Sequence, residues 1–235
     1  MGSRRTVYWF LLATVLAAAV VSAQHHSTAD SADELKQVLQ RLDRTAADFH
    51  SAEASFEWDQ YQKVTDETDK QSGKVYFRRS RGATEMAAEV TSPAPPKKVL
   101  FADGKVQLFQ PKINQLDVYD TSKNNGAVES FLVLGFGGSS KDILNSYEVS
   151  YGGSEKVDGA DTDRLELIPK ADKVKAMFSH IELWIDSRGI SIQQKLLSPE
   201  GDYRINRYTN IVLNQRIPDG VFKIKTPSNV QIENH

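Results

Sequence analysis

The sequence predicts an α+β protein built mainly of antiparallel β-strands, with about ten or eleven strands and two helical inserts. Changes in hydrophobic period lead to this prediction. A helical period near the N-terminus gives way to alternation from about residue 54, and a helical period returns around 128–135. In addition, glycine, proline and polar clusters separate the alternating stretches at short intervals, as expected for neighbouring strands.

The first element is expected to be an amphipathic helix. Ser31 to Glu34 matches a capping box, in which each side chain accepts a hydrogen bond from the backbone N–H of the other residue. Apolar residues then recur at three- and four-residue spacing, so they share one face of the helix. These residues are Leu35, Val38, Leu39, Leu42, Ala46 and Phe49.

Strands separated by turns are expected to follow. Phe56 and Trp58 alternate with acidic residues in the first strand, and the polar run 64–72 is the expected turn after it. Asp103-Gly104 joins two alternating runs, which is a strong hairpin signal, and Gly152-Gly153 is another expected turn. The other expected strands are 73–80, 84–90, 98–102, 105–110, 115–119, 147–151, 163–169, 180–186, 190–198, 203–211 and a stretch from 221.

An open sheet of this length must curl, so one of its faces becomes concave and needs a cover. The apolar faces of the first helix and of the segment 128–135 suit that purpose. The alternative is a small barrel whose interior is filled by side chains. No linker divides the chain, so we expect a signal peptide at 1–23, a flexible segment at 24–30 and a single domain at 31–235.

Composition excludes several classes of protein. The 235-residue chain has 29 Lys+Arg against 31 Asp+Glu, so it lacks the positive charge by which proteins bind nucleic acids. It has no cysteine, which excludes disulfides, thiolate chemistry and a lipid-modified N-terminal cysteine. Beyond the N-terminal apolar stretch, no run is long enough to span a bilayer.

No catalytic or metal-binding motif stands out. The histidines form no zinc-protease pattern, and the glycine-rich segment 135–141 lacks the spacing of a phosphate-binding loop. Asp158, Asp161 and Asp163 lack the order of an EF-hand loop. A hydrolase with paired carboxylates stays open, but nothing in the sequence selects the pair. We therefore expect a protein that is not an enzyme and has no cofactor or metal.

Arg79 has two interpretations. Alternation places Val75, Phe77 and Arg79 on one face of a strand, so a guanidinium on the concave side would need hydrogen-bond partners. In the second interpretation Arg79 ends the strand and its charged group lies in water. Alternation by itself favours the second interpretation.

Several short segments follow one another in an informative order. They are Phe49 to Phe56, Gly73 to Arg79, Leu100 to Lys105, Phe131-Leu132, Leu165 to Lys170 and Phe222 to Pro227. As a set they resemble the periplasmic outer-membrane lipoprotein carrier family, the LolA-like proteins, over nearly the whole chain after the signal. The resemblance implies an unclosed half-barrel with helices that form a lid over an apolar cavity for lipoprotein acyl chains.

The same resemblance implies roles for residues and partners. Arg79 matches a strand arginine that holds the lid closed through hydrogen bonds, which favours the first interpretation above. The cavity would be lined by Leu35, Leu39, Leu42, Phe56, Trp58, Phe77, Phe101, Phe131 and Leu132. The protein would be a periplasmic carrier that takes lipoproteins from an inner-membrane lipoprotein-releasing transporter to an outer-membrane acceptor, and we expect a monomer. Two alternatives stay open: an envelope regulatory protein that senses lipids or lipoproteins, and a carrier of a non-protein lipid.

We expect cleavage after Ala23 and export of the remainder. Arg4 and Arg5 precede a mostly apolar stretch at 7–21, and small residues occupy the cleavage positions. A general secretory signal is favoured over a twin-arginine signal, because the residues after Arg5 fit the latter poorly. N-terminal sequencing of the exported protein checks this. A membrane-bound product that still carries both arginines would show that the segment is an anchor.

Overall fold

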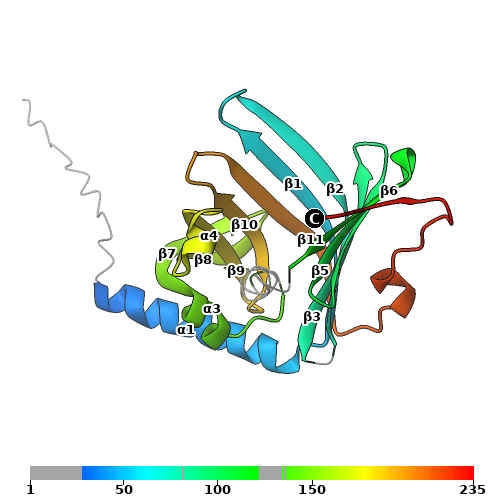
Figure 1. The fold of residues 1–235 in the computed structure, drawn as a ribbon. Helices are drawn as coiled ribbons and strands as arrows, with labels where there is room; N and C mark the ends of the chain where they lie inside the picture. The colour runs from blue at the N-terminus through cyan, green and yellow to red at the C-terminus, as the bar shows by residue number, and fades with distance from the viewer. Residues whose placement is uncertain (1–27, 81, 122–133, 135) are drawn as a thin grey trace, which may run out of the picture.

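The computed structural model describes residues 28–80, 82–121, 134 and 136–235, and its strands form one strongly curled sheet (Figure 1). The helices are α1 (Thr28–Asp48), α3 (Ser140–Ser146) and α4 (Asp172–Lys175), with 3-10 turns at Pro111–Ile113 and Asp219–Phe222. The strands are β1 (Ser51–Gln62), β2 (Glu67–Ser80), β3 (Ala83–Ser92), β4 (Lys97–Ala102), β5 (Lys105–Gln110), β6 (Gln115–Asp120), β7 (Tyr147–Val157), β8 (Ala160–Pro169), β9 (His180–Asp186), β10 (Ser191–Leu197), β11 (Tyr203–Leu213) and β12 (Gln231–Asn234).

The sheet has two wings that meet where β1 pairs with β11. Its strand order is β12-β6-β5-β4-β3-β2-β1-β11-β10-β9-β8-β7, so β12 and β7 are edges and the sheet is not closed into a barrel. The strands pair antiparallel except for β12, which runs parallel to β6. These features confirm the predicted α+β class and the unclosed, mainly antiparallel sheet. The described residues form twelve strands, one more than the upper end of the predicted number.

Two predictions near the N-terminal end of the domain were wrong. The helix α1 includes Thr28, so Ser31 and Glu34 lie inside it and cannot form the capping box expected at its start. The polar run 64–72 is not one long turn, because β2 begins at Glu67 and pairs there with Gln62 of β1. The first four residues of β2 are exposed, so backbone pairing rather than apolar alternation defines this part of the hairpin.

The turn predicted at Gly152-Gly153 was also wrong. Both glycines lie inside β7, where the pairing with β8 shifts register between Tyr151 and Gly153 and marks a bulge. The chain instead reverses at Asp158 and Gly159, whose φ angles are 49° and 83°. Glycine thus marks a bulge at one point and the turn itself a few residues later.

Three groups of buried apolar side chains define the layers. The inner face of β7–β10 packs against α1 and α3 through Val38, Leu42 and Ile143. The inner face of β1–β4 packs against Phe49, just after α1, and against Phe136. The outer face of β2–β4 is covered by Phe222 of the C-terminal segment, drawn orange and red in Figure 1. Among the helices of the described ranges, none is long and apolar enough to span a membrane.

We expect Gly73→Ala to destabilise the fold more than an ordinary glycine substitution. A Cβ atom at Gly73 would lie 1.9 Å from the backbone oxygen of Glu89 in β3. Because this neighbour is backbone, relief requires the strands to separate, and we expect the free energy of unfolding to fall by about 2–3 kcal/mol.

Gly104→Ala is the matched control, because a Cβ there meets nothing within 4 Å and only its φ of 69° is unfavourable. The control should lose about 1 kcal/mol. Chemical denaturation of both variants measures the difference. Equal losses would show that β2 and β3 are not held this close at Gly73.

Candidate functional site

The inner face of the β1–β6 wing is a continuous apolar surface. In one register row, Phe77 of β2 pairs with Met86 of β3, which pairs in turn with Phe101 of β4. In another row, Phe56 of β1 lies between Tyr208 of β11 and Gly73 of β2. Because alternate residues of a strand share a face, these rows stack into one apolar surface that a curled sheet turns inward.

Two segments that are far apart in the sequence cover this surface. Phe136 packs on it with its ring centroid 5.0 Å from that of Phe77 and 5.3 Å from that of Tyr208. Phe49 reaches the same cluster from the end of α1 and is 1% exposed. Both covering residues therefore make contacts that an incoming apolar ligand would have to replace.

The predicted cavity residues fall into two clusters rather than one. Phe56, Trp58, Phe77 and Phe101 belong to the cluster of the β1–β6 wing. Leu35, Leu39 and Leu42 belong to the other cluster, where α1 packs on β7–β10. Phe131 and Leu132 lie outside the described residues. A single cavity lined by all of these side chains stays a prediction.

A small void lies where the end of α1, Phe136 and the sheet meet. The void there has a volume of about 10 Å³ and is lined by Leu42, Phe49, Phe136 and Leu213 among others. That is about the volume needed for one water-sized probe. An acyl chain at this place would therefore require α1 or the segment around Phe136 to move.

Arg79 joins the two covering segments to the sheet. Its Nη1 donates to the backbone oxygen of Ala46 in α1 at 3.4 Å, and its Nη2 donates to the backbone oxygen of Gly137 at 3.0 Å. The guanidinium carbon lies 5.8 Å from the centre of the Phe49 ring. Arg79 is nevertheless an exposed residue. Each of the two interpretations is therefore partly right. Arg79 has hydrogen-bond partners, as the first requires, and it is exposed, as the second requires.

Polar side chains that sequence reasoning missed lie on the inner face where β1 and β11 pair. Trp58 pairs with Asn206, and Gln60 pairs with Arg204, two residues further along each strand. The only sequence signal is alternation, which places Arg204, Asn206 and Tyr208 on one face of β11. The sequence does not show that this face is the concave one.

The comparisons with known proteins identify the family. The family model described as outer membrane lipoprotein carrier protein LolA matches residues 47–225. The chain belongs to the LolA family. Proteins of this family are periplasmic binding and carrier proteins rather than known enzymes. No curated protein sequence matches the chain.

Solved structures resemble this chain at low sequence identity. An uncharacterized conserved protein of Thermus thermophilus is 11% identical with a TM-score of 0.54, over 86% of this chain and 99% of that chain. MucB is 14% identical with a TM-score of 0.50, over 88% of this chain and 66% of that chain. A LolA superfamily protein of Nitrosomonas europaea is 15% identical with a TM-score of 0.41, over 80% and 97% of the two chains.

In this LolA-family chain, polar contacts fix α1 on the β7–β10 wing. Arg41 donates to the carboxylate of Asp163, which also accepts from Tyr151 Oη at 2.9 Å and Ser154 Oγ at 2.7 Å. Two residues further along α1, Asp43 accepts from the backbone N–H and the hydroxyl of Ser140 in α3, at 2.7 and 2.8 Å. The apolar interface beneath α1 is not directional, so these hydrogen bonds fix the orientation of the helix on it.

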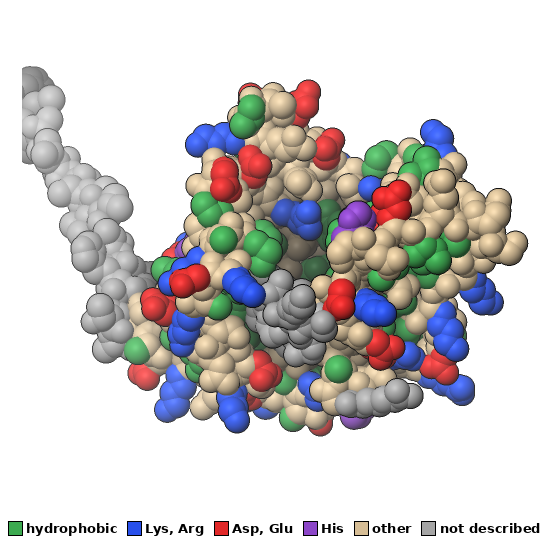
Figure 2. Space-filling view, in the orientation of Figure 1, with side chains coloured by type: hydrophobic (Ala, Val, Ile, Leu, Met, Phe, Trp, Pro, Cys, Tyr) green, Lys and Arg blue, Asp and Glu red, His purple; other side chains and the backbone are tan. Residues whose placement is uncertain are grey.

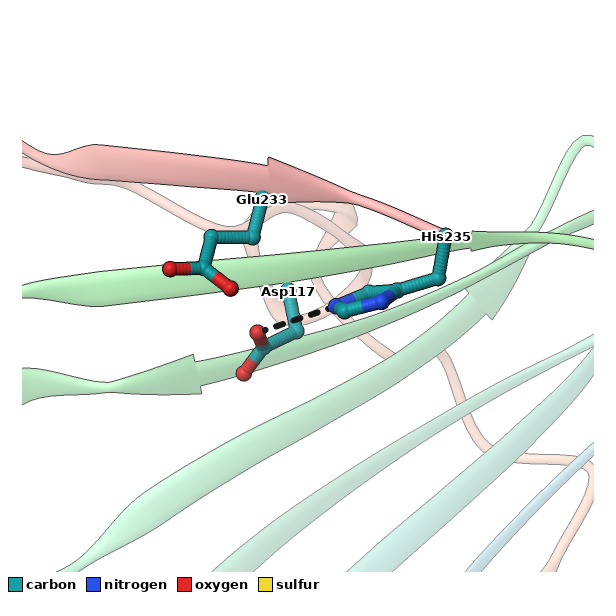
Figure 3. Close-up of side chains that lie close together, drawn as sticks. All are labelled: Asp117, Glu233 and His235. Carbon is teal, nitrogen blue, oxygen red and sulfur yellow. Dashed lines mark hydrogen bonds and ion pairs between the residues drawn. The ribbon is translucent and has the colours of Figure 1, made fainter.

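Asp117, Glu233 and His235 form a cluster at the β6–β12 edge (Figure 3), where one ligand-type atom from each lies within 4.8 Å of the others. The Asp117 carboxylate already accepts from Gln115 Nε2 at 2.7 Å and Gln110 Nε2 at 3.3 Å, and it faces His235 Nε2 at 3.4 Å. The bond from Gln115 contributes most to lowering the pKa of Asp117. The oxygens of Asp117 accept from protein donors, and through these contacts the cluster ties β12 to β6.

We expect the attachment of α1 to weaken in acid. Burial raises the pKa of Asp163, but the hydrogen bonds from Ser154, Tyr151 and Arg41 outweigh burial, so the pKa lies below its ordinary value. A carboxyl group with a lowered pKa stabilises the folded state above its unfolded pKa of about 3.9 and loses this effect as the pH falls through the folded pKa.

Asp163→Asn tests this attachment. At pH 7 the variant should lose about 1 kcal/mol of unfolding free energy, because the group is partly exposed. Its stability should then fall less steeply than that of the wild type between about pH 5 and pH 3. Urea denaturation at each pH measures both effects. Asp161→Asn, on the same strand in an exposed pair with Lys156, is the control and should behave like the wild type. Parallel pH profiles for the wild type and the Asp163→Asn variant would contradict the prediction.

Proposed function

We propose that this LolA-family protein is an exported periplasmic carrier that shields lipoprotein acyl chains on the inner face of its sheet. Each methylene of an acyl chain in water costs about 0.8 kcal/mol relative to an apolar environment. The inner face, with Phe56, Phe77 and Phe101, offers such an environment. The carrier would receive cargo from an inner-membrane lipoprotein-releasing transporter and deliver it to an outer-membrane acceptor, acting as a monomer.

The observation that carries this proposal is the position of Arg79. One guanidinium on β2 donates both to Ala46 of α1 and to Gly137, which follows Phe136. It therefore acts on both covering segments at once. Hydrogen bonds to charged groups contribute about 1.5–3 kcal/mol when sheltered, and less when exposed as here. The bonds are strong enough to bias the cover towards closure.

Loading would exchange the contacts of the cover for contacts of the cargo. An acyl chain of about fifteen methylenes gains roughly 12 kcal/mol on leaving water, which exceeds the contribution of the Arg79 bonds. Delivery would reverse the exchange, because re-forming the Arg79 bonds stabilises the empty, closed protein. Arg79 would thus act as a latch that favours release without any covalent chemistry.

The two alternatives predict different behaviour after loading. A regulatory protein that senses lipids or lipoproteins would bind acyl chains but would not deliver them to membranes. A carrier of a non-protein lipid would deliver free lipid but not a lipoprotein. A transfer assay with both cargoes therefore separates all three functions.

Arg79→Leu should impair delivery while it preserves loading. Without the latch, the open state gains population, so affinity for a labelled lipoprotein should stay equal or rise by up to about 5-fold, and transfer to acceptor membranes should fall by a similar factor. Arg79→Lys should restore only part of the transfer, because an ammonium lacks the planar fork of donors.

Arg78→Leu is the matched control, because Arg78 is the neighbouring residue on the opposite face and binds Glu85 and Asp219 instead. It should load and deliver like the wild type. If the folded Arg79→Leu variant also loads and delivers like the wild type, Arg79 is not a latch. If no protein in the series binds the lipoprotein, the carrier function itself is wrong.

A further inference from the structure

The charged residues of β11 differ between the two faces of the sheet. Arg207, on the outer face, donates to Asp59 Oδ2 at 2.8 Å and to Gln193 Oε1 at 3.2 Å. Arg204, three residues earlier and on the inner face, donates from Nη2 to Gln60 Oε1 at 3.0 Å. Among the residues that the structure describes, no carboxylate lies within 4 Å of the Arg204 nitrogens. By contrast, five other arginines each pair with an acid, namely Arg41, Arg78, Arg164, Arg188 and Arg207.

Arg204 lies in a hollow rather than on a flat surface. Its side chain is exposed, and its guanidinium carbon lies 5.9 Å from the centre of the Trp58 ring. Desolvation by surrounding protein lowers its pKa, although an arginine stays protonated. A side chain inside a concavity can be accessible to solvent and still be surrounded by protein atoms, and Arg204 has both properties. Figure 2 shows such a hollow between the two wings, with basic side-chain atoms inside it.

A pocket of about 190 Å³ adjoins Arg204. Its lining combines apolar Phe178 and Leu196 with Gln60 and Tyr203. Asp202 also borders it, but the Asp202 carboxylate accepts from the backbone N–H of Lys63 at 2.8 Å. This volume far exceeds that of the void beside α1 and is on the scale of a small polar head group.

Two buried polar atoms lie one residue pair further along the strands. Trp58 Nε1 is a donor and Asn206 Oδ1 is an acceptor, and within the part of the chain that the structure describes neither makes a hydrogen bond. The other end of the Asn206 amide is occupied, because its Nδ2 donates to Gln194 Oε1 at 3.2 Å, and Gln194 in turn donates to the backbone oxygen of Leu134. Strand geometry places the Trp58–Asn206 pair about 7 Å from the Gln60–Arg204 pair.

Along β1 and β11, the inner face therefore changes from charged to polar to apolar over three successive residue pairs. Arg204 supplies a positive charge without an acidic partner, the Trp58–Asn206 pair supplies one donor and one acceptor, and Phe56 with Tyr208 begins the apolar surface. An acylated glycerol phosphate has the same order of groups: an anion, then an ester carbonyl and a hydroxyl, then a hydrocarbon chain. Arginine suits this anion because its planar fork matches phosphate oxygens.

We propose that Arg204, Trp58 and Asn206 form a head-group site for an anionic acyl glycerolipid. Arg204 would hold the phosphate, Trp58 Nε1 would donate to the ester carbonyl, and Asn206 Oδ1 would accept from a glycerol hydroxyl. This assignment rests on the binding of acyl chains to the inner face proposed above and extends it to a second class of cargo, a non-protein lipid, since the acylated end of a lipoprotein carries no phosphate. A free fatty acid shares the anion and the chain but lacks the glycerol ester.

Binding of defined amphiphiles to the mature protein tests the proposal. The probes are palmitoyl lysophosphatidylglycerol, palmitate, monopalmitoylglycerol and a triacylated lipopeptide, with glycerol 3-phosphate as the head group without a chain. Calorimetry gives the affinities. The fluorescence of Trp58 reports whether a ligand occupies the site, and the Trp184→Phe background removes the signal of the second tryptophan that the structure describes. We expect the lysophospholipid to bind at least about 10-fold more tightly than the neutral glycerolipid, palmitate to bind between the two, and glycerol 3-phosphate to bind weakly.

Arg204→Gln should abolish the preference for the anionic probe and leave the affinity for monopalmitoylglycerol within about two-fold. Arg204→Lys should retain part of the preference and covers the case in which the Gln variant fails to fold. Arg207→Gln, the matched control on the outer face, should bind every probe like the wild type.

Three failures are distinguishable. If the lipopeptide and the neutral lipid bind but the phosphate gives no advantage, or if Arg204→Gln changes nothing, the head-group site is wrong and the carrier proposal stands. If palmitate binds as tightly as the lysophospholipid, the glycerol-ester assignment of Trp58 and Asn206 is wrong. If no amphiphile binds, both proposals are overturned.

Discussion

The sheet carries an apolar inner face but does not close on itself, so other parts of the chain must keep water away from that face. Cross-strand rows such as Phe77, Met86 and Phe101 cannot be buried by the strands that contain them. In a closed barrel, opposite walls would cover each other. Here the edges β7 and β12 stay apart, and helices and loops take over the role of the missing wall.

The cover is attached differently on the two wings. On β7–β10, α1 is fixed by a broad apolar interface that includes Val38 and Leu42, together with the bonds of Asp163. On the β1–β6 wing, the described contacts are few: Phe49 and Phe136 pack on the sheet, and Arg79 bonds to two backbone oxygens. Apolar area contributes in proportion to its extent, whereas a few exposed hydrogen bonds contribute little each. The two wings therefore hold the cover by different kinds of contact.

Much of this architecture is readable from local pattern. Alternation identified the strand cores and the Asp103-Gly104 hairpin, because side chains of successive strand residues point to opposite faces whatever the strand pairs with. The pattern failed where backbone pairing continued without apolar residues, as in the exposed start of β2. It also failed at the four-residue strand β12, which is too short for alternation to be recognised. Local sequence could not separate the bulge at Gly153 from a turn, because glycine suits both.

The sequence by itself determined which residues share a face of a strand: Arg79 shares one with Phe77, and Arg204 shares one with Tyr208. The tertiary structure decided what each face meets. The acceptors of Arg79 lie 33 and 58 residues away in the chain, and the Gln60 partner of Arg204 lies 144 residues away. Such partners depend on which strands pair across the sheet and on the direction in which the sheet curls. Neither leaves a local signal, because both follow from the burial of the whole inner face at once.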